Sequence, residues 1–179
     1  MKKIILTITI VAFALLSGKL SAQSFKFASI NSSELMQAMP ELTEVQNKME
    51  TYGKDLEQQI EELQVEVNKK LDAYQKIEST LTDEVKLAKQ NEIVEMRRKV
   101  QERGASAEEE FATEYRKSME PVQTKLRNAI NKVGKSNGFT YIFDLAPDAN
   151  TGVVAIPFLN PDQVVDANDL VKKELGITK

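Results

Sequence analysis

Few side chains in this sequence could carry acid–base or nucleophilic chemistry near neutral pH. There is no histidine and no cysteine, which removes the usual neutral-pH base, the thiolate nucleophile and the thiolate zinc site. The clearest carboxylate pair is Asp144 with Asp148, and paired carboxylates can divide acid and base roles. However, Asp144 falls on the polar side of a predicted strand and Asp148 in a predicted turn. With no glycine-rich phosphate loop either, we expect neither an enzyme nor a cofactor.

A run of basic residues is the second feature that could carry a function. Between positions 86 and 103 six basic residues stand against three acidic ones, a local charge of +3: Lys86, Lys89, Arg97, Arg98, Lys99 and Arg103. Such a run could contact acidic clients or, transiently, an anionic membrane surface. A solvated helix face with pairs such as Glu95–Lys99 would give the same pattern and is the commoner case, so both interpretations stay open.

The first 22 residues have the layout of a secretory signal peptide. Residues 1–3 are positively charged, residues 4–16 are apolar, and residues 20–22 end in small side chains. We therefore expect export and cleavage near Ala22. The alternative is an uncleaved anchor, although the apolar run is shorter than the roughly 20 residues that a membrane span needs.

The predicted mature chain is acidic. Removal of Lys2, Lys3 and Lys19 from 24 basic residues, against 27 acidic ones, leaves a net charge of about −6. Net charge bears on partners rather than on fold. An acidic surface disfavours nucleic acid as the main partner, and we expect none.

A long charged helical hairpin is predicted over residues 41–136, which are rich in good helix formers. The first half carries apolar residues spaced by threes and fours, the pattern of a coiled-coil seam: Leu42, Val45, Met49, Tyr52, Leu56, Ile60, Leu63, Val67, Leu71, Tyr74 and Ile77. A helix over residues 41–79 would be about 58 Å long at 1.5 Å per residue. No domain of this size holds such a helix in its core, so it must project as an arm.

The seam is interrupted over residues 79–84. Thr80 and Thr82, each followed by acidic residues, are suitable helix N-caps, and a second seam continues from Val85 to Val133. We predict two antiparallel helices with a tip near residue 80. A single uninterrupted helix is the alternative, because no glycine or proline marks the break.

Gly53 and Gly104 lie well inside the predicted arm. A hairpin folded at about residue 79 places Gly53 beside Gly104. Each glycine weakens a helix by roughly 1 kcal/mol relative to alanine, so two at one height predict a hinge. Close contact between the helices, or chance, is the alternative explanation.

A small sheet is predicted where the two ends of the chain meet. Residues 25–30 alternate as a strand does, residues 139–145 alternate likewise, and residues 153–156 are β-branched and apolar. Residues 147–152 form a turn between the last two strands. We expect these two strands to make a hairpin that pairs with the first strand. A short helix is predicted over residues 164–176, with Asp166 as its cap and Gly176 as its end.

The fold class is therefore α+β, with a body at residues 23–40 and 137–179 and an arm at residues 41–136. A three-stranded sheet with only short helices beside it is marginal alone. Self-association into a closed, barrel-like body would cover its aromatic face. The expected protein is a small sheet body, closed by association, with a long projecting antiparallel coiled-coil hairpin.

In order, these segments resemble the OmpH/Skp family of periplasmic chaperones. The resemblance rests on the signal peptide, FKFASINSSELMQAMPEL, the helical hairpin, FTYIFDLAP, VVAIP and the ending VVDANDLVKKELG, and it covers nearly the whole mature chain. It implies a periplasmic homotrimer whose strands form the body. Three arms would enclose a cavity that holds unfolded outer-membrane β-barrel proteins without ATP. Members of this family are often basic, whereas this chain is acidic.

We assign residues to two surfaces of such an assembly. The expected trimer body core is Phe25, Phe27, Ile30, Phe139, Tyr141, Phe143, Val154 and Ile156. The basic run on the arm is the candidate for contact with client or membrane. The main alternative function is a structural coiled-coil spacer or adaptor of the cell envelope, which would bind a fixed partner and leave unfolded clients unaffected.

Overall fold

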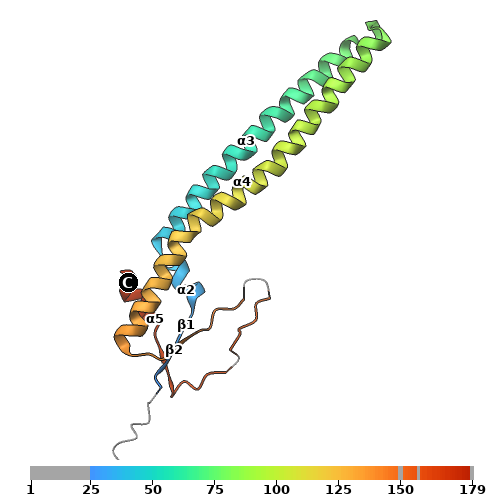
Figure 1. The fold of residues 1–179 in the computed structure, drawn as a ribbon. Coiled ribbons are helices and arrows are strands. Elements are labelled where there is room, and N and C mark those ends of the chain that lie inside the picture. Colours follow the sequence, from blue (N-terminus) through green and yellow to red (C-terminus); the bar gives the residue numbers. More distant parts are fainter. Residues whose placement is uncertain (1–24, 149–150, 157, 178–179) are drawn as a thin grey trace, which may run out of the picture.

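The computed structural model describes residues 25–148, 151–156 and 158–177, and shows a small body with a long projecting arm (Figure 1). The predicted signal peptide at residues 1–22 lies outside the described residues. The elements are β1 (Phe27–Ile30), α2 (Ser32–Gln37), α3 (Pro40–Ile77), the 3-10 helix η1 (Glu78–Thr80), α4 (Asp83–Asn137), β2 (Tyr141–Asp144), β3 (Val164–Asp166) and α5 (Asn168–Leu175). This confirms the α+β class: a small sheet combined with a long helical hairpin.

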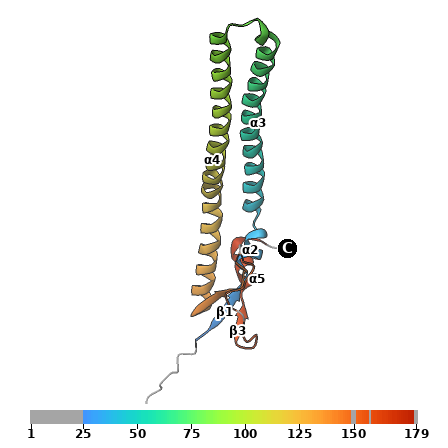
Figure 2. The same cartoon turned by 90° about the vertical axis from the view of Figure 1, so that its right-hand side faces the viewer.

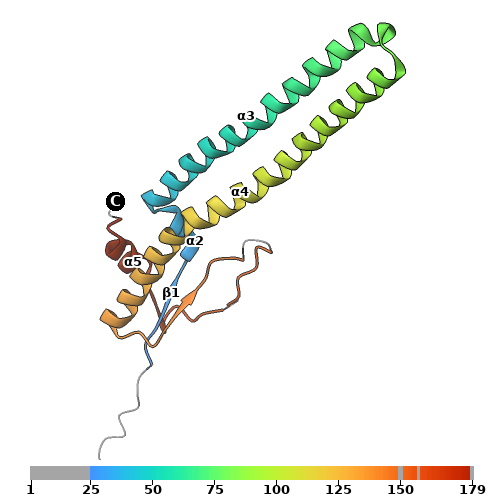
Figure 3. The ribbon, with the colours of Figure 1, turned by 45° about the horizontal axis from the view of Figure 1, so that its top comes forward.

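The arm is an antiparallel pair of helices that meet at a tip. Helices α3 and α4 lie side by side in both turned views (Figures 2 and 3). After η1, Leu81 and Thr82 are both extended, with ψ angles of 149° and 156°, and two extended residues end a helix without glycine or proline. Asp83 and Glu84 then open α4, where acidic side chains favour the helix N-terminus. The tip predicted near residue 80 is correct, and the single uninterrupted helix is wrong.

The seam between α3 and α4 packs as two separate apolar clusters. The one nearer the body continues the body core outward along the arm, through Val45, Met49, Met119, Val122 and Leu126. The one nearer the tip is built around Val67, Tyr74 and Ile93. Between them, Leu56 and Ala107 are buried but belong to neither cluster. The apolar packing of the arm is therefore discontinuous at mid-length.

The sheet has the strand order β2–β1–β3, and both outer strands run parallel to β1. Phe27 stands opposite Tyr141 on one side and Val164 on the other. Parallel neighbours need long crossover connections. The whole arm is the crossover from β1 to β2, and residues 145–163 are the crossover from β2 to β3. The first strand thus finds its partners far away in sequence, as predicted.

The predicted hairpin of two strands is wrong. Residues 153–156 form no strand in the described structure, only a single antiparallel bridge between Pro147 and Val154. The turn itself exists, because the Asp148 carboxylate accepts hydrogen bonds from the backbone N–H and the hydroxyl of Thr151 at 2.9 and 3.0 Å. The ladder stops at once because Pro147 has no N–H to donate.

The third strand lies where the start of a helix was predicted. Val164–Asp166 pairs with β1, and α5 begins only at Asn168. β-branched Val164 and Val165 favour a strand. The Asp166 carboxylate accepts from the Asn168 N–H at 2.9 Å, so it still supports the helix start, but from the end of a strand. Gly176 ends α5 in the left-handed region, with φ 75°, as predicted.

One face of the sheet carries the core of the body. Ala28 and Ile30 of β1 are buried with Leu35 of α2 and Val171 of α5. The last turns of α4 approach this face closely: a Cβ on Gly134 would lie 3.3 Å from the Ile142 side chain. Helices α2, α4 and α5 contribute to this one core cluster.

Two glycine-to-alanine substitutions are expected to have opposite effects. Gly138 ends α4 with φ 67°, so Gly138→Ala is expected to lower the free energy of unfolding by about 1 kcal/mol. Gly104 is helical and no atom lies within 4 Å of an added Cβ, so Gly104→Ala is expected to raise it by up to about 1 kcal/mol. Urea unfolding followed by circular dichroism measures both. Shifts of the same sign would contradict this assignment.

Candidate functional site

Four aromatic rings form a continuous patch on the sheet face opposite the core. Phe27 stacks on Phe25, Tyr141 and Phe143, and Tyr141 also stacks on Phe143, with centroid separations of 6.0–6.4 Å. The parallel register explains this, because Phe27 stands opposite Tyr141 and Ser29 opposite Phe143. We call these four residues the aromatic face.

The aromatic face is open in the described chain. Phe25 and Tyr141 are 60% and 59% exposed, and Phe27 and Phe143 are half-buried. An apolar patch of this kind on a soluble protein usually marks an interaction surface. The sequence predicts that the aromatic face of the sheet requires further cover. The exposed fractions of Phe25 and Tyr141 show that a single chain does not provide it.

The expected trimer body core is divided by the structure. Ile30 is 3% exposed within the chain's own core, so it is buried without a second chain, and its place in a trimer core stays a prediction. The reason for its burial is strand alternation: Ile30 is three residues from Phe27 and faces the other side. Phe139 also packs against that core, with the Lys26 ammonium 4.7 Å above its ring. Val154 lies outside the named strands, half-buried like Ile156, in the crossover from β2 to β3.

The basic residues on the arm do not form one free patch. Lys86 pairs with Asp83 at 3.7 Å. Arg98 binds Glu95 at 2.7 Å and also pairs with Glu102. These ion pairs lie along α4 itself, which is the pattern of a solvated helix face.

Of the other four basic residues, one is paired and three are not, within the residues that the structure describes. Arg103 binds Glu110 at 3.0 Å and reaches Gln59 of α3 at 2.9 Å. Lys89, Arg97 and Lys99 make no ion pair within the described part of the chain. Three of the six predicted cations are therefore neutralised by neighbours. A contact between this segment and client or membrane stays a prediction.

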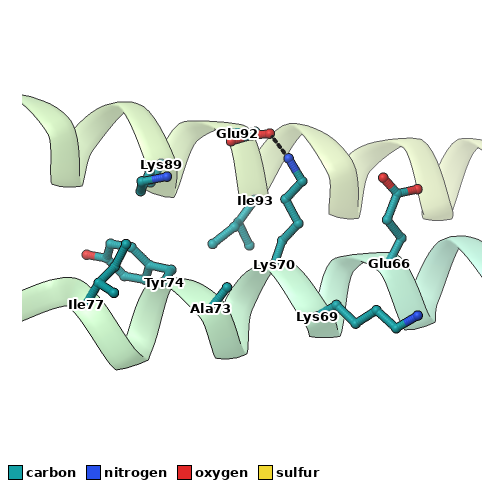
Figure 4. A pocket seen from close by; sticks show the side chains of 9 residues that line it. All are labelled: Glu66, Lys69, Lys70, Ala73, Tyr74, Ile77, Lys89, Glu92 and Ile93. Carbon is teal, nitrogen blue, oxygen red and sulfur yellow. Dashed lines mark hydrogen bonds and ion pairs between the residues drawn. The ribbon is translucent and has the colours of Figure 1, made fainter.

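A hollow of about 410 Å³ lies between the helices near the tip (Figure 4). Lys70 of α3 and Glu92 of α4 form an ion pair at its rim, and Lys89 of α4 and Tyr74 of α3 also line it. The Tyr74 hydroxyl donates to Glu78 at 2.9 Å and accepts from Gln90 at 2.8 Å. Burial, and then the bond to Glu78, raises the pKa of Tyr74. The Gln90–Tyr74 hydrogen bond and the Lys70–Glu92 ion pair tie α3 to α4 near the tip.

Three ion pairs join the two helices at different heights. Glu41 pairs with Lys125 near the body, Lys48 binds Glu114 at 2.6 Å, and Lys70 pairs with Glu92 near the tip. Each lysine donates a hydrogen bond to its carboxylate, and this bond lowers the pKa of all three glutamates below the ordinary value of 4.5. These pairs fix the heights at which residues of α3 and α4 face each other.

The ion pairs predict that the arm loses stability in acid. A carboxylate whose pKa is lowered by folding stabilises the fold above its unfolded pKa, 4.5 here, and loses that contribution as the pH falls through the lower folded pKa. We expect thermal melts of the helical signal to shift to lower temperature between about pH 6 and about pH 3. Glu92→Gln should reduce this shift, and an unchanged shift would contradict a role for the tip pair.

The predicted pairing of the two glycines is wrong. Gly53 faces Phe111, since a Cβ added to Gly53 would lie 3.4 Å from a ring carbon, whereas Gly104 has no atom within 4 Å of its added Cβ. The two glycines therefore lie about two helical turns apart in height. The cause is the pair of extended residues at the tip, which shifts the register of α4 against α3. A hinge at either glycine stays a prediction.

Both candidate acid–base carboxylates have structural partners. Asp144 accepts from the N–H groups of Ser32 and Ala146 at 3.0 and 2.9 Å, and ties β2 to the start of α2. Partial burial raises the pKa of Asp144, but hydrogen bonds from Ser32 and Ala146 outweigh it and lower the pKa overall. Asp148 holds the turn described above. Within the described ranges no cluster of three potential metal-binding side chains occurs.

The sequence matches the family described as "Outer membrane protein (OmpH-like)" over residues 26–175. That match spans the sheet and the arm. The chain belongs to the OmpH-like family.

A solved structure supports the same fold for this OmpH-like chain. The protein is from Caulobacter crescentus and is described as a candidate outer membrane chaperone (OmpH-like). The likeness has a TM-score of 0.69, covers 88% of each chain and comes with 13% sequence identity. Comparison with curated proteins finds no match. None of the helices in the described ranges is both long and apolar enough to cross a membrane.

Proposed function

We propose that this OmpH-like protein is an ATP-independent holdase of the periplasm that keeps unfolded outer-membrane β-barrel proteins from aggregating. Membership of the family supports a chaperone role, and the related structure is described as that of a candidate outer membrane chaperone. A holdase requires sheltering surface rather than catalytic groups. The layout of the N-terminal residues supports export, with cleavage near Ala22.

The observation that carries the proposal is the open aromatic face at the foot of a projecting arm. Residues 23–40 and 137–179 act as an association body, and residues 41–136 as the arm. Three chains would cover their aromatic faces against one another. A body closed in this way would also leave no free sheet edge. The arms would then project together around a shared space in which an unfolded client is held.

The test is a measurement of mass followed by an aggregation assay. The mature chain from Gln23 is purified, and its mass in solution is measured by multi-angle light scattering. A urea-unfolded outer-membrane β-barrel protein is then diluted into it without nucleotide, and turbidity is followed. We expect a trimer that suppresses turbidity at about one trimer per client.

The other outcomes separate the alternatives. A stable oligomer that leaves turbidity unchanged would contradict the holdase function and favour a spacer or adaptor of the cell envelope. A monomer would contradict the role of the aromatic face. Anionic vesicles added to the same assay test the basic segment of the arm, since a membrane contact would be lost in the variant Arg97→Gln, Lys99→Gln.

A further inference from the structure

A groove lies on the arm where the apolar packing of the seam is discontinuous. Its floor is Met49, Gly53, Phe111 and Tyr115, and its volume is about 500 Å³. We call it the Gly53 groove. Met49 is only 4% exposed, whereas Phe111 and Tyr115 are 36% and 44% exposed. Two aromatic rings thus face solvent at a place where the seam on either side is buried.

Gly53 leaves the groove without a side chain on the α3 side of the Phe111 ring. Phe111 follows buried Ala107 by one helical turn and so occupies a seam position, where α3 would normally supply a covering side chain. Leu56, one turn further along α3, is 5% exposed. At Gly53 an added Cβ would lie 3.4 Å from the ring of Phe111, at ordinary contact distance. A leucine there would extend from this contact beside the Phe111 ring into the groove that both residues line.

The rim of the groove is polar and acidic. Gln46, Glu50, Lys54 and Glu57 line it from α3. Lys54 is paired with Glu50 at 2.6 Å, and Glu57 makes no ion pair within the described part of the chain. Two carboxylates and one ammonium give the rim a net charge of −1, so the apolar floor beside it is complementary to an apolar side chain followed closely by a basic one.

We propose that the Gly53 groove takes a large apolar side chain, preferentially aromatic, of an unfolded polypeptide segment that carries lysine or arginine beside it. This rests on the proposed holdase function and names a contact point on the arm. The volume suits one or two side chains rather than a folded partner. The Tyr115 hydroxyl supplies a polar handle for the backbone of the segment. One such groove binds weakly, and grooves on several arms add avidity.

The chain contains no tryptophan, which makes a peptide tryptophan a selective probe. The probe is a synthetic glycine–serine peptide with one tryptophan followed by two lysines, titrated with the mature, assembled protein. We expect a saturable blue shift of the tryptophan emission. The same peptide with glutamates in place of the lysines is expected to bind several-fold more weakly, and Glu57→Gln should remove most of that difference.

Filling the groove is the decisive test. Gly53→Leu is expected to weaken peptide binding by about tenfold or more, and Gly53→Ala by less. Gly104→Ala is the matched control, because it gains the same helix propensity in open space. Equal binding by Gly53→Leu and Gly104→Ala would overturn the proposal. A change of oligomer mass in Gly53→Leu would also overturn it, by assigning the groove to a contact between chains.

The turbidity assay separates this inference from the function on which it rests. If the client stays soluble but the peptide never binds, the groove proposal fails while the holdase function stands. If the peptide binds in the groove but turbidity is unaffected, the holdase function fails and the groove remains a peptide-binding site. The two proposals therefore have independent readouts on the same preparation.

Discussion

Under the proposed association through the aromatic face, Phe27→Lys is expected to convert the assembled protein into monomers. Phe27 is the centre of the aromatic face, since it stacks on three other rings. A lysine there would place a charge in an apolar contact between chains, where it is neither paired nor hydrated. Loss of a central aromatic anchor of this kind costs roughly 3 kcal/mol per contact. That is about a hundredfold in the association constant.

Multi-angle light scattering over a range of protein concentrations measures this effect directly. The matched control is Val94→Lys, which introduces the same charge at a residue 59% exposed on the arm and should leave the mass unchanged. Far-ultraviolet circular dichroism should remain close to that of the parent protein, because the helices supply most of the signal. A Phe27→Lys protein that keeps its mass would show that the aromatic face is not the association surface.

The second large effect is expected within a single chain. Leu35 of α2 is 0% exposed, in the cluster that joins the sheet to α3, α4 and α5. Leu35→Ala removes its side chain from the core and leaves a cavity, which typically costs 2–5 kcal/mol. We expect a loss of roughly 3 kcal/mol in the free energy of unfolding, a large share of the stability of a small domain.

Urea unfolding at a fixed protein concentration measures the loss, because association contributes to apparent stability. Leu87→Ala is the control: Leu87 is 59% exposed on α4, and alanine is at least as good a helix former. Its effect should stay within about 0.5 kcal/mol. If both variants unfold at the same urea concentration, α2 is not an integral part of the core.

Local patterns in the sequence were sufficient to predict the arm. Apolar residues at intervals of three and four specify which faces of two helices meet, and Thr82 followed by Asp83 specifies where the second helix begins. Periodicity does not specify the axial position of one helix relative to the other. The register of the hairpin depends on the geometry of two extended residues at the tip, and for that reason the facing of Gly53 with Phe111 was missed.

The sheet was predicted less well, because its pairing is decided by distant contacts. Val164 and Val165 are followed by Asp166, a good helix-cap residue. The same three residues are therefore compatible with the end of a strand and with the start of a helix. Residues 153–156 have strand propensity, but in the described structure only Val154 pairs with another segment, through its single bridge to Pro147. Only parallel pairing with β1 settles which segment becomes the third strand. The side of Ile30, by contrast, could have been read from its spacing to Phe27.

The separation of β1 from its partners also has a kinetic consequence. Lys26 and Thr140 are hydrogen-bonded although 114 residues apart in sequence. Contacts between residues so far apart form slowly when the intervening chain is unstructured. If α3 and α4 pair first, the hairpin brings both ends of the arm together, and little closure entropy remains to be lost. The tip would then act as a folding nucleus for a body that it never touches. Weakening the tip should slow the formation of the sheet without altering any contact within it.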